Sequence, residues 1–147
     1  MAIEQTFAII KPDAVQAGNC GKIIGMIEDQ GFEILRLQKG QLSPDLAELF
    51  YDEHKEKPFF KELVDFISSG PIIIMALQKD NAIADWRKLM GATNPEEAEE
   101  GTVRKQFASS IGKNAVHGSD SSESAQRELA LFFAEPAPAG AQEQAQQ

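Results

Sequence analysis

Four apolar stretches along the chain have the length and composition of buried strands. They cover residues 6–10, 33–39, 71–78 and 114–117. The third contains Ile72, Ile73, Ile74 and Met75 in succession, and a continuous apolar run of this length is typical of a central strand. The pattern therefore predicts a sheet of four strands.

Apolar positions at helical spacing fill the segments between these strands. The predicted helices begin near residues 23, 43, 58, 80 and 121. The second has a capping serine, Ser43, and a first-turn proline, Pro44, both of which favour a helix start. We expect Leu46, Leu49 and Phe50 to form the inward face of that helix.

Strands and helices follow each other in a regular order. The order is strand, helix, strand, helices, strand, helix, strand, helix, and the one indication of a hairpin lies across the middle of the chain. Right-handed crossovers leave few ways to connect such elements. We predict an α+β fold of ferredoxin-like type, a split β-α-β sandwich in which helices cover one four-stranded antiparallel sheet.

Two segments fall outside this regular pattern. Residues 91–112 form a predicted long ordered loop, with helical turns around 96–99 and 103–109, and loops of this length in a compact domain are usually functional. Residues 135–147 are dominated by Pro, Ala, Gly and Gln, a composition that cannot bury a core. The sequence thus predicts one domain over residues 1–134 and a flexible tail over residues 135–147.

The composition restricts the cellular compartment and the class of protein that we expect. A chain of 147 residues suits a single domain, and its one cysteine, Cys20, rules out an intramolecular disulfide. One cysteine and two separated histidines also make a zinc site unlikely to form. No apolar run approaches the roughly 18 residues of a membrane span, and the first residues lack the basic start of a signal peptide. We expect a cytoplasmic protein without a membrane partner.

The charge balance restricts the partners. A net charge of −9 argues against a general nucleic-acid surface, which would need a basic stripe. The same charge still permits a small anionic substrate, because a few cations in a cleft can create a local positive potential.

The strongest candidate for a reactive residue is His117, one of the two histidines, in the segment Asn114–Ser121. Gly118 permits a tight backbone path or the close approach of a ligand. Asp120 is a predicted helix cap, so helix N–H groups would face an anion nearby. A neutral imidazole there can act as a nucleophile or a general base. Taken alone, however, His117 could be a structural histidine, and Lys11 could be a solvated strand end.

A series of motifs in fixed order resolves this ambiguity, because together they resemble the nucleoside diphosphate kinase family. The resemblance covers the chain from about Thr6 to Phe133 without a large gap. The motifs are Thr6-Phe7-Ala8-Ile9-Ile10-Lys11-Pro12-Asp13-Ala14-Val15, Tyr51-x-x-His54-x-x-x-Pro58-Phe59-Phe60, Ser69-Gly70-Pro71, Arg87-x-x-Met90-Gly91-Ala92-Thr93-Asn94-Pro95, Gly101-Thr102-Val103-Arg104 and Asn114-Ala115-Val116-His117-Gly118-Ser119-Asp120-Ser121. Each motif alone is weak, and their co-occurrence is highly specific.

The resemblance assigns a role to each matching residue. The phosphohistidine of the family falls on His117, and Ser119 and Glu128 would hold its imidazole. The base would stack on Phe59, with Leu63 and Ile111 lining the slot. The phosphate-binding groups fall on Lys11, Tyr51, Arg87, Thr93, Arg104 and Asn114. No catalytic role falls on His54, which we interpret as structural. Glu100 and Ile111 depart from the residues frequent in the family, and neither departure touches the chemistry.

The implied activity is transfer of a γ-phosphoryl group from a nucleoside triphosphate to a nucleoside diphosphate. It would be Mg²⁺-dependent and ping-pong, with broad base and sugar specificity, and the metal would be held mainly by nucleotide phosphates and water. Relatives assemble from a common dimer, and we favour a tetramer of this chain over a dimer or hexamer. Two rivals remain: a non-catalytic nucleotide sensor, and a phosphatase in which water attacks the phosphohistidine.

Overall fold

Over residues 3–133, which the computed structural model describes, four strands form one sheet in the order β2-β3-β1-β4. The strands are β1 (Ile3–Ile10), β2 (Glu33–Gly40), β3 (Ile72–Asp80) and β4 (Val116–Gly118). Each neighbouring pair is antiparallel, and the central strands β1 and β3 pair along their whole length, from Ile3 opposite Asp80 to Ile10 opposite Ile73. This topology confirms the predicted ferredoxin-like α+β fold.

Helices occupy every connection between the strands, as the sequence predicts. They are α1 (Pro12–Gln16), α2 (Cys20–Asp29), α3 (Pro44–Phe50), α4 (Phe60–Ile67), α5 (Ala82–Met90), α6 (Val103–Phe107) and α7 (Ser122–Phe132), with single 3₁₀ turns η1 (Asp52–His54) and η2 (Pro95–Glu97). The sequence pattern did not predict α1, because a helix of five residues is too short to show an apolar period.

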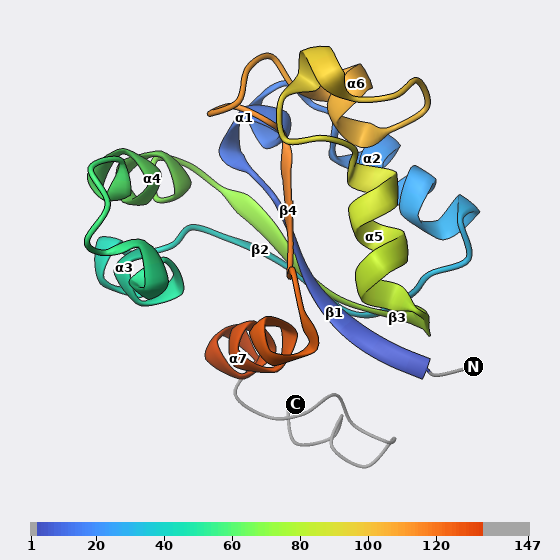
Figure 1. Cartoon of the computed structure of the whole chain (residues 1–147), viewed down its shortest axis with the longest axis horizontal. Helices are drawn as coiled ribbons and strands as arrows, with labels where there is room; N and C mark the ends of the chain where they lie inside the picture. The colour runs from blue at the N-terminus through green and yellow to red at the C-terminus, as the bar shows by residue number, and fades with distance from the viewer. Residues whose placement is uncertain (1–2, 134–147) are drawn as a thin grey trace.

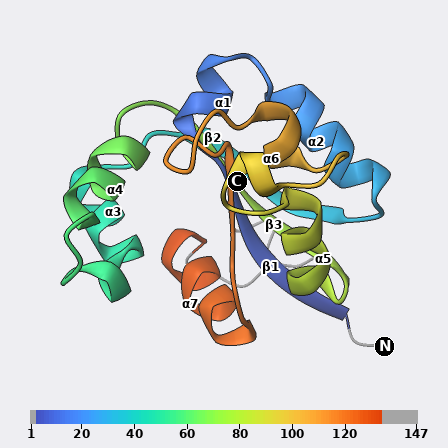
Figure 2. The same ribbon diagram turned by 45° about the horizontal axis from the view of Figure 1, so that its top comes forward.

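The sheet carries a core on each face because successive side chains of a strand point to opposite sides. On β1, Ala8 and Ile10 belong to a core with α2 and α5, whereas Phe7 and Ile9 belong to a core with α3, α4 and Phe133. Figures 1 and 2 show α2 and α5 on one side of the sheet and α3, α4 and α7 on the other. The sheet therefore lies between two packed layers.

The start of α3 agrees with the prediction, but its inward face does not. Ser43 caps the helix, since its side chain accepts a hydrogen bond from the Leu46 N–H. The prediction that Leu49 points inward is wrong, because this side chain is 55% exposed. The helix has only seven residues, and Ala47 and Phe50, three positions apart, form its buried face.

The long segment between α5 and β4 contains η2 and α6, which confirms both predicted helical turns. It passes over one end of the sheet, beside α1 (Figure 1). The predicted tail, residues 135–147, lies outside the described residues, and the proposed boundary at residue 134 stays a prediction.

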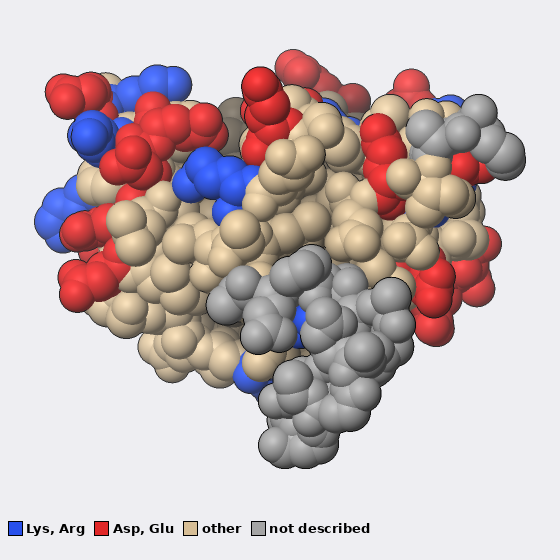
Figure 3. Space-filling view, turned by 90° about the horizontal axis from the view of Figure 1, so that it is seen from below, with Lys and Arg blue, Asp and Glu red and all other residues tan. Residues whose placement is uncertain are grey.

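The charges on one face of the molecule agree with the acidic composition. Figure 3 shows acidic side chains along the upper and outer parts of this face, with the visible basic side chains in separate groups. None of the helices within residues 3–133 is long and apolar enough to cross a membrane.

Candidate active site

His117 lies on the short edge strand β4, opposite Ile9 of β1. Its Nε2 is 3.1 Å from Oε1 of Glu128 on α7. Ser119 donates its hydroxyl to the same oxygen at 2.9 Å and accepts the backbone N–H of Phe7 at 3.3 Å. Because a carboxylate oxygen can only accept, the imidazole holds its proton on Nε2 and keeps its lone pair on Nδ1. The two residues predicted to hold His117, Ser119 and Glu128, are therefore in place.

The surroundings of His117 favour its neutral form. Burial lowers the pKa of the imidazole, and the nearby charges of Lys11 and Arg104 lower the pKa further, whereas Glu128 opposes the shift. The ring of Phe50 packs edge-on against the imidazole at a centroid distance of 4.9 Å, and 21% of the His117 side chain remains exposed. A neutral, fixed imidazole with partial access to solvent has the properties of a nucleophile.

Lys11 follows β1 directly and is almost completely buried. Its Nζ donates a hydrogen bond of 2.9 Å to Oδ1 of Asn114. Burial and the neighbouring Arg104 lower the pKa of Lys11 to about 8, with Asp13 acting in the opposite direction. The interpretation of Lys11 as a solvated strand end is thus wrong, because its side chain is buried and burial of a cation is unfavourable unless the charge is used.

Arg104 is fixed by three neutral acceptors. Its guanidinium donates to the backbone carbonyls of Asn114, Gly91 and Val116, at 3.3, 3.0 and 2.9 Å. Burial and the charge of Arg87 lower the pKa of Arg104 to about 10, so it is positive at neutral pH. These bonds hold the guanidinium without neutralising it, and its charge remains available to an anion.

A cavity of about 380 Å³ opens beside His117. It brings together five of the predicted site residues, which are Arg87, Thr93, Arg104, His117 and Glu128, with the rest of the wall formed by Glu53, His54, Met90, Gly91, Ala92, Gly118 and Asp120. Lys11 and Asn114 join this set through Arg104, which bonds to the Asn114 carbonyl. Two arginines, Arg87 and Arg104, line the cavity together with the carboxylates of Glu53, Asp120 and Glu128, and the buried cation of Lys11 lies beside Arg104, so cations are available to an anionic ligand close to His117.

Tyr51, predicted to bind phosphate, is buried behind this wall rather than part of it. Its ring lies against Phe50 and His54, with centroid distances of 4.8 and 6.2 Å. Burial and the charge of Glu128 raise the pKa of Tyr51, so the phenol keeps its proton and can donate a hydrogen bond.

The three residues predicted to contact a base lie outside the cavity wall. Phe59 precedes α4 and is 42% exposed, Ile111 is 59% exposed, and Leu63 is partly buried one turn into α4. The segment that carries Ile111, between α6 and β4, extends towards α4 in both ribbon views (Figures 1 and 2). The ring of Phe59 is 5.9 Å from that of His54, which links this surface to the cavity.

His54 lines the cavity, although the sequence interpretation made it structural. Its Nδ1 is buried and has no hydrogen-bond partner among residues 3–133. A buried polar atom without a partner needs an explanation, and a ligand in the cavity supplies one. The spacing Tyr51-x-x-His54 was visible in the sequence, but only the 3₁₀ turn η1 shows that it brings His54 to the cavity.

Asp120 also lines the cavity and is not the helix cap that the sequence predicted. Ser121 caps α7 and forms a capping box with Ser124, whose hydroxyl also donates to Asp120 Oδ1 at 2.8 Å. That bond and the nearby Arg87 and His117 lower the pKa of Asp120. The prediction was wrong by one residue because serine and aspartate are equally good caps.

Gly118 lines the cavity, and packing also requires glycine at this position. A Cβ at this position would lie 2.5 Å from the indole of Trp86 and 2.7 Å from Met90. The indole Nε1 of Trp86 also donates to the His117 carbonyl at 3.2 Å. Trp86 on α5 therefore holds the backbone of β4 at His117, and only glycine fits beside it.

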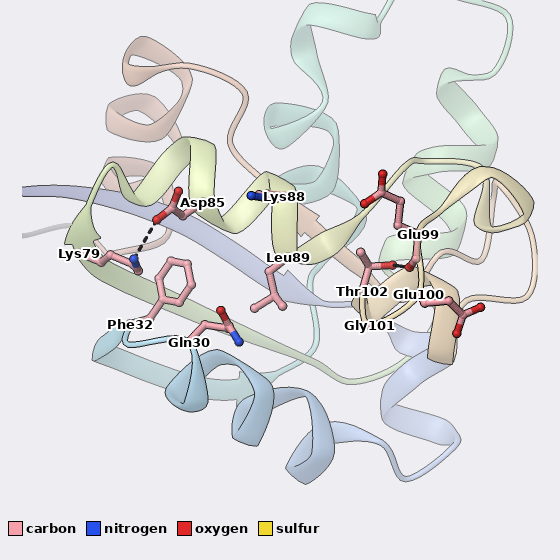
Figure 4. Close-up of a pocket in the computed structure, with 10 residues that line it drawn as sticks. All are labelled: Gln30, Phe32, Lys79, Asp85, Lys88, Leu89, Glu99, Glu100, Gly101 and Thr102. Atoms are coloured by element: carbon pink, nitrogen blue, oxygen red, sulfur yellow. Dashed lines mark hydrogen bonds and ion pairs between the residues drawn. The ribbon is translucent and has the colours of Figure 1, made fainter.

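A second cavity, of about 310 Å³, lies on the α2 and α5 side of the sheet. Figure 4 shows Lys79 paired with Asp85 there, and Leu89 and Gln30 directed between the helices. Lys79 is neutralised by its partner at 2.8 Å, and none of the predicted site residues lines this cavity. The cavity beside His117 is therefore the candidate active site.

Comparison with known proteins agrees with this geometry. The sequence model of the family described as nucleoside diphosphate kinase matches residues 4–137. A nucleoside diphosphate kinase of Trichlorobacter lovleyi is 58% identical over 131 residues, which are 89% of this chain and 95% of the relative. One of Histophilus somni is 54% identical over 135 residues, or 92% and 96% of the two chains.

Solved structures give the same result. A crystal form of the Aquifex aeolicus nucleoside diphosphate kinase has a TM-score of 0.89 at 44% identity, over 90% of this chain and 96% of the other. The Halobacterium salinarum enzyme, in complex with CDP, has a TM-score of 0.88 at 38% identity, over 92% and 91%. The chain therefore belongs to the nucleoside diphosphate kinase family and is a phosphotransferase.

Proposed function

We propose that the protein transfers the γ-phosphoryl group of a nucleoside triphosphate to a nucleoside diphosphate through a phosphohistidine on Nδ1 of His117. The observation that carries this proposal is the hydrogen bond between His117 Nε2 and Glu128, because it leaves the lone pair on the other ring nitrogen. A sensor that only binds nucleotide would have no use for a histidine fixed in this way.

In the first half-reaction, the Nδ1 lone pair forms a bond to the γ-phosphorus while the bond from that phosphorus to the β–γ bridging oxygen breaks. The nucleoside diphosphate leaves with the bonding electrons, and Nε2 keeps its proton, which Glu128 stabilises as the ring becomes cationic. The second half-reaction is the reverse, with another diphosphate as the acceptor. Both use one site, which gives ping-pong kinetics.

Fixed charges stabilise the transferring group. Phosphoryl transfer leaves the protein mainly positioning and electrostatic work, and Arg87, Arg104 and Thr93 line the cavity at His117. Lys11 and Asn114 add donors next to Arg104, and Tyr51 is a further donor in this proposal. We add His54, whose unpartnered Nδ1 can bond to a phosphate oxygen.

The residues of this site are compatible with a magnesium ion that is bound to the nucleotide. No group of three or more His, Cys, Asp or Glu within residues 3–133 could hold a metal ion, but the carboxylates of Glu53 and Asp120 line the cavity and can accept bonds from water on a nucleotide-bound ion. When bound, Mg²⁺ would neutralise charge on the phosphate oxygens.

Broad nucleotide use follows from the exposed base surface. Stacking on Phe59 needs no particular hydrogen bonds, so purines and pyrimidines are both accepted. The CDP complex of the Halobacterium salinarum relative supports a pyrimidine in such a site.

The decisive experiment uses γ-labelled ATP with Mg²⁺, followed by acid or base treatment of the protein and addition of GDP. We expect acid-labile, base-stable label on the protein that moves to GDP as GTP. Bound ATP without labelled protein would support the sensor, and release of label to water in place of GDP would support the phosphatase.

We further propose a cytoplasmic homo-oligomer, with a tetramer favoured over a dimer or hexamer. Sedimentation equilibrium of the full chain gives the number of subunits directly. A mass of two or six chains would replace the tetramer in this proposal without affecting the chemistry.

A further inference from the structure

The backbone turns sharply between Asn114 and Val116, immediately before β4. The Val116 N–H donates to the Asn114 carbonyl at 2.9 Å, which closes a three-residue γ-turn. Its central residue, Ala115, is fully buried and has a φ of 76°. This conformation is strained for a residue with a side chain and persists only where its surroundings enforce it.

Both backbone groups of Ala115 bind the start of α1 and the residue directly before it. Its carbonyl accepts the Lys11 N–H at 2.8 Å, and its N–H donates to Oδ2 of Asp13 at 3.1 Å. Of these two hydrogen bonds to Ala115, only the one to the Asp13 carboxylate involves a side chain. Asp13 is more than 100 positions from Ala115 in sequence. It enforces the strained turn from outside β4.

The groups on either side of this turn are those that build the site. Asn114, before it, accepts from Lys11 with its side chain and from Arg104 with its carbonyl. Val116, after it, accepts from Arg104 and is followed by His117. A change in the turn would therefore move two cations and the nucleophile relative to one another.

We infer that Asp13 is a positioning residue for phosphoryl transfer. It holds Ala115 in the γ-turn and thereby keeps Lys11, Arg104 and His117 in their positions relative to one another. The inference rests on the proposed function. It differs from a local role of Asp13 as an acidic residue in the first turn of α1, where it would favour only that helix.

The chain offers a matched control for this local role. Asp45 follows Pro44 in the first turn of α3, as Asp13 follows Pro12 in the first turn of α1. Asp45 is exposed on a helix that carries no residue of the cavity wall. Asp45→Ala removes a first-turn charge in the same sequence context and leaves the site untouched.

The test compares D13A, D13N, A115G, D13A/A115G and D45A by the rate of His117 phosphorylation with ATP and by Tm. We expect D13A to slow phosphorylation about 10- to 100-fold, the size expected for a small misplacement of reacting groups. D13N keeps an acceptor for the Ala115 N–H and should stay within about threefold of the parent, as should D45A.

Rescue by glycine separates positioning from helix stability. Glycine adopts positive φ without strain, so D13A/A115G needs the anchor less and should recover most of the lost rate. A first-turn effect on α1 would not respond to residue 115. If D13A does not fold, the double variant should restore both folding and phosphorylation.

The inference is overturned if D13A phosphorylates His117 at the parental rate, or if D13A/A115G is as slow as D13A. A parental protein that never becomes labelled on histidine refutes instead the proposed function on which the inference depends. The two failures are thus distinguished by the parental protein alone.

Discussion

The proposed phosphate end and the proposed base end of the site are built in opposite ways. Around His117, buried polar groups are held by hydrogen bonds from β1, α6 and α7, and Lys11 and Arg104 are almost completely buried. At the proposed base end, Phe59 and Ile111 are largely exposed, and their apolar side chains can form no hydrogen bond.

The two ends differ in how much they reduce the free energy of unfolding. Burial is costly for both Lys11 and Arg104, since it lowers the pKa of each, and the proposed anionic ligand would offset that cost. The exposed surface at Phe59 buries no charge, and in the proposed function it would discriminate little between bases. We expect mutations at the phosphate end to affect turnover strongly and mutations at the base end to affect binding weakly.

The largest effect is expected for His117→Ala. Loss of the nucleophile should reduce turnover by about 10⁴-fold or more, because no other group can form the covalent intermediate. Nucleotide binding should remain nearly intact, since the cations stay in place. Calorimetric titration with ADP beside a turnover assay checks both, and loss of binding together with activity would contradict the separation of roles.

The second-largest effect is expected for Arg104→Ala. Removing a fixed cation that stabilises the transferring group should lower kcat by about 10²-fold or more. Arg104 also ties the carbonyls of Gly91, Asn114 and Val116 together, so Tm should fall as well. Arg127→Ala is a matched control, because Arg127 also donates to backbone carbonyls, those of Leu49 and Phe50, away from the cavity. Equal losses in the two variants would refute a charge-stabilising role.

A pH dependence follows from Lys11. Its pKa is lowered to about 8, so the free enzyme loses this positive charge as pH rises through that value. We expect kcat/KM to decline above about pH 8, by up to about tenfold for each pH unit if one proton is lost. Lys11→Arg keeps its charge, so its profile should stay flat to higher pH even at a reduced level. An unchanged alkaline decline in Lys11→Arg would assign that decline to another group.

The smallest effect is expected at the base end. Phe59→Ala should raise KM about 5- to 20-fold, within the range for loss of one stacking contact, with little change in kcat. The increase should be similar for ATP, GTP and CTP, because stacking is tolerant of the base. Ile111→Val is the conservative control and should change KM less than about twofold. A large loss for one base only would reveal a specific contact on this surface.

The sequence by itself determined the fold class and the succession of strands and helices along the chain. The apolar periods specify which segments are strands and helices, and the resemblance to the family led to the prediction that Arg87, Thr93, Arg104 and His117 share one site; the structure brings these four residues to one cavity. These features are local or are carried by residue type, so they can be recognised without coordinates.

Only the tertiary structure decided which polar residues are buried and what faces them. The resemblance assigned a role to Lys11 and none to His54, but only the fold shows that Lys11 is buried against Asn114 and that His54 lines the cavity. Gly118 is required by Trp86, and Asp13 binds Ala115 across 102 positions of sequence. Such contacts depend on which strands pair and how closely layers pack, and neither is encoded in any single segment of the chain.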